Sequence, residues 1–338
     1  MTTGQASIAA STRYRWKLLR AGEFRLDAGT MFGVIPRVVW SRTCPPDERN
    51  RLPVNHNCLL LERVGDAPAD SKLPSPKLIL IEAGTGDKLD AKSRELFALQ
   101  DRTILTALQE VNCDPKDIGA AVITHLHFDH AGGLSRLARP GESPDWTGPA
   151  SSFGAPRGDI ACKKTLPNAA VFTQRREWDD AIANRSTMTR TYFTDHLEVI
   201  REQLTLIESP RAFPLGATPD RTDVPTVPQH ARETEIMPGI FVFLTPGHTW
   251  GQQAVRFVDD QGRHIVFTPD VLPTAWHLGA AYSIGYDVEP YTTMITKTWL
   301  LAEAADRDWV LCLDHEPGPE PMRRVRRNDK GWYDLVSM

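Results

Sequence analysis

The stretch Thr124-His125-Leu126-His127-Phe128-Asp129-His130-Ala131-Gly132-Gly133 places three imidazoles and a carboxylate within six consecutive residues. Protonated imidazoles crowded in this way would repel one another, whereas divalent cations take neutral imidazoles and carboxylate oxygens as ligands. In an extended segment His125 and His127 point to the same side, while Asp129 and His130 can turn towards a neighbouring ion. The stretch therefore predicts a metal site rather than a solvated, histidine-rich turn.

The residues around this stretch place it at the end of a strand. The apolar run 120–124 leads directly into His125, and the run 77–84, KLILIEAG, predicts a neighbouring buried strand that ends in a glycine-rich turn. Residues 58–62 predict a further strand, and the polar stretch around 91–111 predicts a helix. We therefore expect the histidines at the C-terminal end of a strand within a sheet.

Further along the chain, three predicted strands each end just before another potential ligand. The pairs of strand and ligand are 239–245 with His248, 264–268 with Asp270, and 309–313 with His315. Taken alone, each of these side chains would more often be a cap or a loop residue. Together with the first stretch, they complete two metal sites.

Two segments interrupt the alternation of strands and helices. Residues 139–167 are rich in proline, glycine and serine, and residues 209–238 contain several prolines in mostly polar sequence. Both compositions are typical of surface loops. We therefore predict one domain over residues 1–338, with insertions at about 139–167 and 209–238.

Composition argues against several classes of protein. The net charge of −4 gives no basic field for a nucleic acid, and the arginine-rich run 323–330 is predicted to be a solvated end segment. No run approaches the roughly 20 apolar residues that span a bilayer, so no membrane association is expected. Five cysteines without a C-x-x-C motif favour neither a disulfide framework nor a zinc ribbon, which predicts a cytoplasmic location.

The order of these motifs, H-x-H-x-D-H, then P-G-H-T, then a strand-end Asp and a late strand-end His, resembles the metallo-β-lactamase superfamily over residues 78–315. The resemblance implies an α/β fold, a four-layer αββα sandwich with the metals at one sheet edge. It also implies how the ligands divide between the ions. The first ion would be held by His125, His127 and His248, and the second by Asp129, His130 and His315, with Asp270 bridging.

Within the superfamily, the chain is nearest to the lactonase, glyoxalase II-like and esterase group. His127 replaces the Glu of the oxygen-reducing di-iron branch, and Asp270 replaces the Cys or Ser of the antibiotic-hydrolysing branches. Quorum-quenching lactonases have a Tyr three residues beyond the bridging Asp, where this chain has Pro273. Either Glu82 or Asp87 could support a ligand histidine by a hydrogen bond.

These features predict a binuclear metal-dependent hydrolase, in which a metal-bridged hydroxide attacks a lactone, ester or thioester. Asp129 and Asp270 are the predicted catalytic residues. The alternatives are a phosphoester or organophosphate hydrolase and a non-catalytic metal-binding sensor protein. Two divalent ions per chain are expected, zinc by default, although manganese, iron, cobalt and nickel accept the same ligands.

The expected partner is a small-molecule substrate. Trp250, Trp276 and His277 follow the predicted ligands in sequence and are candidate substrate contacts. The sequence leaves the oligomeric state open between a monomer and a homodimer.

Overall fold

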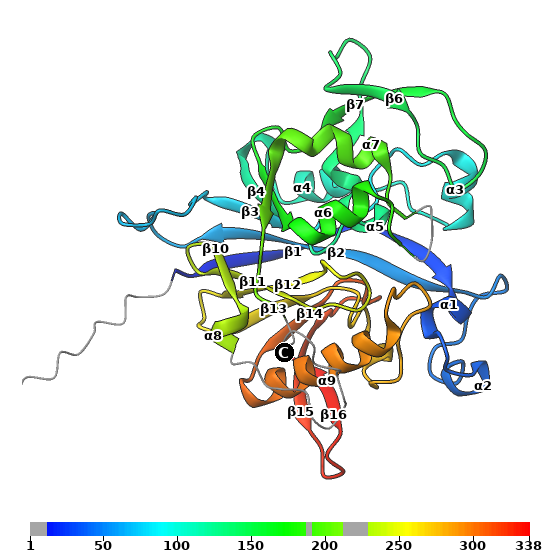
Figure 1. Cartoon of the computed structure of the whole chain (residues 1–338), viewed down its shortest axis with the longest axis vertical. Coiled ribbons are helices and arrows are strands. Elements are labelled where there is room, and N and C mark those ends of the chain that lie inside the picture. The colour runs from blue at the N-terminus through cyan, green and yellow to red at the C-terminus, as the bar shows by residue number, and fades with distance from the viewer. Residues whose placement is uncertain (1–11, 187–190, 212–228) are drawn as a thin grey trace, which may run out of the picture.

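The computed structural model describes residues 12–186, 191–211 and 229–338, which form a layered α/β fold. Figure 1 shows two sheets packed face to face, with helices on the outer side of each. The predicted four-layer αββα architecture is confirmed.

The first sheet has six strands in the order β1-β2-β3-β4-β8-β9. Their bounds are β1 Tyr14–Asp27, β2 Arg51–Arg63, β3 Leu78–Ile81, β4 Ile118–Val122, β8 Ala170–Gln174 and β9 Leu204–Ile207. β3, β4, β8 and β9 run parallel, and both faces of β3 and β4 are covered, which accounts for their continuous apolar sequences.

The second sheet has seven strands in chain order, β10 to β16. Their bounds are β10 Thr234–Met237, β11 Ile240–Leu244, β12 Gln253–Val258, β13 His264–Thr268, β14 Val310–Leu313, β15 Met322–Arg327 and β16 Tyr333–Ser337. The arginine-rich run is exposed at Arg326, Arg327 and Lys330, as a solvated segment would be, but its first part is built into the sheet as β15. Val325 is buried there, while Arg324 and Arg326 pair with Asp308.

Helices cover the outer faces of both sheets, and α1 and α2 lie at one side of the sandwich (Figure 1). Those near the first sheet are α3 Ala91–Leu96, α4 Ile104–Glu110, α5 Phe128–Ala131, α6 Arg175–Ile182 and α7 Thr194–Leu197, with the 3₁₀ turns Pro115–Asp117, Gly132–Leu134 and Glu198–Gln203. The others are α1 Ala28–Phe32, α2 Arg37–Trp40, α8 Gln229–Arg232, α9 Pro290–Asp306 and the 3₁₀ turn Ala275–His277. The polar stretch predicted as one helix therefore forms two, α3 and α4.

Three apolar clusters fill the interfaces between the four layers. Leu59, Val122 and Phe267 belong to the cluster between the two sheets. A second cluster packs the first sheet against α4 and α6, and a third packs the second sheet against α9. Because the sheet faces are occupied by apolar packing, the polar side chains that follow the strands gather at the sheet edge.

The two predicted insertions differ from simple loops. Residues 139–167 contain β6 (Trp146–Pro149) and β7 (Asp159–Lys164), which form a small sheet with β5 (Ser135–Leu137). Residues 212–228 of the second insertion lie outside the described residues, and the rest of it includes α8 and β10. The division into one domain stays a prediction.

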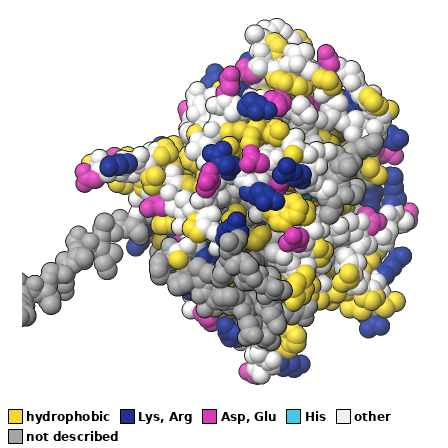
Figure 2. Space-filling model, viewed as in Figure 1, with side chains coloured by type: hydrophobic (Ala, Val, Ile, Leu, Met, Phe, Trp, Pro, Cys, Tyr) yellow, Lys and Arg dark blue, Asp and Glu magenta, His cyan; other side chains and the backbone are white. Residues whose placement is uncertain are grey.

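The surface and the cysteines agree with the composition. On the face shown in Figure 2, basic and acidic side chains are interspersed. All five cysteines are free thiols, and four of them are buried. Within the described ranges, no helix combines the length and the apolar character that a bilayer crossing requires. The cytoplasmic location stays a prediction.

Candidate metal centre

The loop after β4 carries four of the seven predicted ligands. β4 ends at Val122, and the chain turns through the next residues into the short helix α5. A Cβ atom on Gly133 would lie 2.0 Å from the carbonyl oxygen of Ala83. The glycines after the histidines therefore allow this loop to pack directly on the turn that follows β3.

The other three predicted ligands follow strands of the second sheet. His248 lies after β11, Asp270 after β13 and His315 after β14. The first four belong to a loop of the first sheet. The structure thus brings all seven side chains together from both sheets, in two neighbouring clusters.

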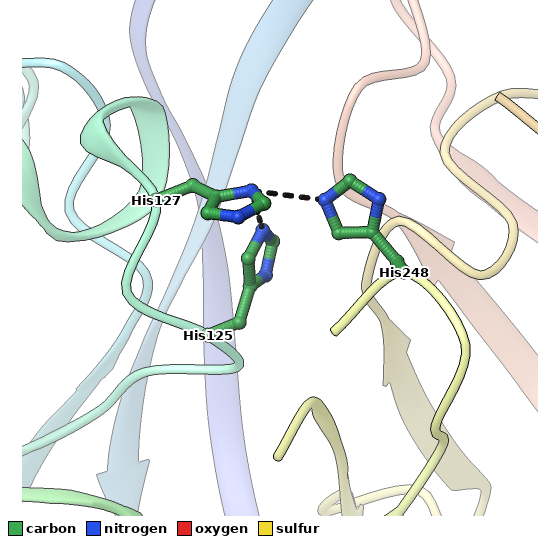
Figure 3. Close-up of side chains that lie close together, drawn as sticks. All are labelled: His125, His127 and His248. Atoms are coloured by element: carbon green, nitrogen blue, oxygen red, sulfur yellow. Dashed lines mark hydrogen bonds between the residues drawn. The ribbon is translucent and has the colours of Figure 1, made fainter. Parts of the chain in front are cut away.

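The first cluster contains His125, His127 and His248 (Figure 3). The Nδ1 atom of His127 lies 3.1 Å from Nε2 of His125 and 3.0 Å from Nε2 of His248. The carboxylate of Asp270 lies beside them, with Oδ2 3.1 Å from Nε2 of His248. Three imidazole nitrogens and one carboxylate oxygen therefore converge, which suits a tetrahedral cation.

The second cluster contains His130, Asp314 and His315, and the carboxylate of Asp129 joins it. The Oδ2 atom of Asp129 lies 3.8 Å from Nε2 of His130 and 3.6 Å from Nε2 of His315. Asp270 reaches this cluster through its other oxygen, since Oδ1 is 3.3 Å from Nε2 of His315. Asp270 therefore faces both clusters, in agreement with its expected bridging position.

The atoms that point into the second cluster fit a cation. Nε2 of His130, Nε2 of His315 and Oδ1 of Asp270 are buried and have no hydrogen-bond partner. A void of about 10 Å³ lies beside them. Buried nitrogen and oxygen atoms left unpaired are costly in free energy, and a divalent ion would satisfy them together.

The pKa values of the ligand histidines shift in different directions, and those of His130 and His248 are raised by nearby carboxylates. Burial lowers the pKa of His125 and of His127 well below the ordinary value, which leaves both rings in the neutral form that binds metals. Burial acts in the same direction on His130. There, however, the charges of Asp129 and Glu82 outweigh burial and hold the pKa well above the ordinary value.

Four of the five ligand histidines are held by their second ring nitrogen, whereas Nε2 of His127 is buried and has no hydrogen-bond partner among the described residues. Nδ1 of His125 is 3.1 Å from the hydroxyl of Thr124, Nδ1 of His248 is 2.9 Å from Asp287, and Nδ1 of His315 is 2.8 Å from the carbonyl oxygen of Asn55. Such partners fix the orientation of a ligand ring. Asp287 was missed in the sequence because it lies 39 residues from His248 in a loop without a motif.

The choice between Glu82 and Asp87 is settled by geometry. Oε2 of Glu82 lies 3.1 Å from Nδ1 of His130, and its Oε1 accepts a hydrogen bond from the backbone N–H of Thr124. Asp87 instead accepts a hydrogen bond from the backbone of Leu137. Glu82 is thus the residue that supports a ligand histidine.

Asp314 is a further buried carboxylate of the second cluster, with a ligand atom within 4.8 Å of those of His130, Asp270 and His315, although no sequence motif predicts it. Its Oδ2 atom has no hydrogen-bond partner and lies 3.8 Å from Nδ1 of His130. Burial and the charge of Asp270 raise the Asp314 pKa well above the ordinary value. Its position directly before His315 is the only signal of it in the sequence.

A cavity of about 390 Å³ opens onto both clusters. Its wall is largely apolar and aromatic, and includes Leu26, Met31, Leu96, Phe97, Phe128, Phe153 and Ile284. Its polar lining includes Asp129, Asp270 and Tyr286, with the arginines of residues 25, 49 and 51. A small apolar molecule in this cavity would lie against the predicted metal ligands.

The three candidate substrate contacts are not among the described residues that line this cavity. His277 is fully buried, with its ring nitrogens 2.8 Å from the Thr274 hydroxyl and 2.7 Å from the Met31 carbonyl oxygen. Trp276 packs against the apolar cluster around α1, and Trp250 lies under the guanidinium group of Arg176. Their role as substrate contacts stays a prediction.

Comparison with known families and structures agrees with this geometry. A family model described as the metallo-beta-lactamase superfamily matches residues 76–315. No curated protein matches the chain.

Solved structures share the fold across nearly the whole chain. A probable metal-dependent hydrolase from Staphylococcus aureus is 22% identical, with a TM-score of 0.72, covering 98% of this chain and 99% of that one. AidC, a dizinc quorum-quenching lactonase, is 15% identical with a TM-score of 0.63, covering 98% and 96%. The hydrolase AbOPH of the beta lactamase superfamily is 18% identical with a TM-score of 0.63, covering 98% of both chains.

Proposed function

The chain belongs to the metallo-beta-lactamase superfamily and is a metal-dependent hydrolase, and from this premise we propose that it cleaves an ester-like bond in a small molecule. The bond is that of a lactone, an ester or a thioester. The two clusters hold two divalent ions, with zinc as the default metal.

One observation carries the proposal. The seven predicted ligands are buried and lie, together with Asp314, in two clusters, and a mostly apolar cavity opens directly onto them. An apolar wall suits the hydrocarbon part of an acyl compound, and the polar floor suits its carbonyl group. The dizinc lactonase among the similar structures supports the same class of substrate.

The bound ions would supply a water molecule acidic enough to react at pH 7 and positive charge for the oxygen of the carbonyl under attack. The side chains of the protein set the geometry. Four of the five histidines are fixed by their outer ring nitrogens, so their ligand atoms stay directed at the floor of the cavity; these are His125, His130, His248 and His315.

Asp129 and Asp270 are the proposed catalytic residues, because both line the cavity and both contribute to the clusters. Asp129 would orient the attacking water and accept its proton. Tyr286 lies in the same cavity, and burial raises its pKa to about 12, so its hydroxyl keeps its proton at pH 7. That hydroxyl can donate to the substrate, in a chain where Pro273 replaces the tyrosine of quorum-quenching lactonases.

The test combines elemental analysis with hydrolysis of a lactone, a thioester, an aryl ester and a phosphotriester, before and after chelation. A His125→Ala variant is the control for turnover that does not depend on the centre. We expect near two metal ions per chain and a chelator-sensitive activity on one of the three carbonyl substrates, restored by zinc.

The other outcomes decide between the alternatives. Turnover of the phosphotriester alone would replace the proposal with organophosphate hydrolysis, which the same pair of ions can promote. Two bound metals with no turnover above the His125→Ala control would favour a metal-binding sensor. A protein with neither metal nor turnover would refute the proposal.

A further inference from the structure

Glu177 lies in the first turn of α6 and is completely buried, with an exposed fraction of 0%. The positive end of the helix dipole would explain an acidic residue in this first turn. That explanation does not account for burial, because an exposed carboxylate would interact with the dipole without losing its hydration. A buried carboxylate has a large desolvation cost, which its contacts have to offset.

The carboxylate of Glu177 accepts three hydrogen bonds from three segments. Its Oε1 accepts from the backbone N–H of Leu126 at 2.9 Å and from the hydroxyl of Tyr192 at 3.0 Å. Its Oε2 accepts from the hydroxyl of Thr249 at 2.6 Å. The neighbouring arginines pair elsewhere, Arg176 with Asp180 for example.

These three contacts surround the first cluster. Leu126 is the residue between His125 and His127, Thr249 directly follows His248, and the Tyr192 ring lies 5.0 Å from the His127 ring. Glu177 therefore contacts a residue next to each of the three histidines drawn in Figure 3.

The two ligand loops also have little room to move relative to α6. A Cβ atom on Gly251 would lie 2.2 Å from the backbone nitrogen of Glu177. The chain just after His248 is thus packed directly onto the start of α6. A loop in such close contact transmits a displacement of the helix to its histidine.

We propose that Glu177 is the positioning residue of the first ion site. Its carboxylate holds the 125–127 loop of the first sheet and the 248–249 loop of the second sheet at the separation that lets three imidazole nitrogens converge. The inference rests on the proposed metal-dependent function and adds a residue outside the ligand set. Glu177 acts through the ligands and touches neither ion nor substrate.

The test compares Glu177→Ala and Glu177→Gln with Asp180→Asn. Asp180 is an equally buried carboxylate on α6, bonded to Arg176 and Arg185 rather than to a ligand loop. Asp180→Asn should therefore destabilise the fold about as much as the Glu177 variants do, but it leaves the two ligand loops in place. Cobalt affinity is measured by chelator competition, and the visible spectrum of the cobalt-loaded protein reports the geometry around the ion.

We expect Glu177→Ala to weaken binding of one cobalt ion about 10- to 100-fold, the range seen for residues that support metal ligands, and to alter the spectrum. Asp180→Asn should keep the cobalt affinity and the spectrum of the wild type, although its melting temperature should be similar to that of the Glu177 variants. Glu177→Gln keeps an oxygen for the Leu126 N–H, so it should give an intermediate loss. Thr249→Val, which removes a single hydrogen bond to Glu177, should lower the cobalt affinity several-fold.

Two results would overturn the inference while leaving the proposed function intact. One is a Glu177→Ala protein that binds both ions with wild-type affinity and spectrum. The other is an equal loss in Asp180→Asn, which would mean that general destabilisation is responsible. If Glu177→Ala fails to fold, Glu177→Gln and Thr249→Val decide in the same way. A wild-type protein that binds no ion would instead refute the proposed function.

Discussion

Asp129 belongs both to the second cluster and to the wall of the cavity. We predict that Asp129→Ala removes about one equivalent of metal and lowers turnover at least about 100-fold, since a positioned acid or base commonly contributes that much. Metal analysis and steady-state kinetics check this. Asp87→Ala, which removes a carboxylate bonded to the backbone of Leu137, is the matched control. Wild-type turnover in Asp129→Ala would contradict its assigned role.

Lys297 is a second residue with an unusual environment. It is fully buried in α9, and its ammonium group donates to the carbonyl oxygen of Tyr282 at 2.8 Å. Burial lowers its pKa from 10.5 to about 8, although the charge of Asp287 opposes this. The folded protein therefore binds fewer protons than the unfolded chain between these pH values, so this residue's contribution to stability rises with pH.

We predict that the free energy of unfolding of the wild type, relative to Lys297→Met, rises between pH 8 and 10.5 by up to about 1.4 kcal/mol per pH unit. Below pH 7 both forms of the chain are protonated and the difference is flat. Denaturant unfolding of both proteins across this range is the measurement. A difference that does not change with pH would show that Lys297 is not buried as described.

At the scale of the elements, the start of α9 supports the loop that carries His248. The backbone N–H groups of Val288 and Glu289 donate to the carbonyl oxygens of His248 and Gly247, at 3.1 and 2.9 Å. Gly247 has a φ angle of 136°, and a Cβ atom there would lie 2.4 Å from the backbone nitrogen of Thr293. Only glycine fits between the loop and the helix.

Gly247→Ala should therefore lower the free energy of unfolding by at least about 2 kcal/mol, because it combines backbone strain with overpacking. It should also weaken metal binding, since His248 shifts with its loop. Thermal unfolding and cobalt titration are the measurements. Gly158→Ala, at a position where a Cβ atom meets no atom within 4 Å, should leave both unchanged. Equal behaviour of the two variants would refute this account.

At the scale of the whole molecule, the predicted ligands join the two sheets. His125, His127 and His130 follow a strand of the first sheet, whereas His248, Asp270 and His315 follow strands of the second. Bound ions would therefore cross-link the halves of the sandwich. A ligand that binds only the folded state stabilises it by about 4 kcal/mol at a concentration one thousand times its Kd.

We predict that chelation lowers the melting temperature by several degrees, and that zinc restores it. The shift should be clearly smaller in His125→Ala, in which the first site lacks a ligand. Differential scanning calorimetry with parallel metal analysis checks this. An unchanged melting temperature after proven loss of both ions would show that the ions do not hold the sheets together.

Much of the centre could be predicted from the sequence because its ligands follow apolar strands in short, dense motifs. The strand before His125 and those before His248, Asp270 and His315 are predicted correctly to within a few residues. β1 was missed because its alternation of apolar and polar residues breaks at Leu18-Leu19 and again at the irregularity between Arg20 and Glu23. β15 was missed because four of its six residues are arginines.

The sequence by itself determined the family, the layered fold and the seven predicted metal ligands. Each of these depends on local apolar runs and closely spaced ligand residues, which are visible in the sequence. Only the tertiary structure decided which residues support them. Glu177 meets Thr249 across 72 residues, and His315 meets the Asn55 carbonyl across 260. A hydrogen bond between distant segments leaves no periodic trace in the chain, because it depends on where the two sheets bring their loops together.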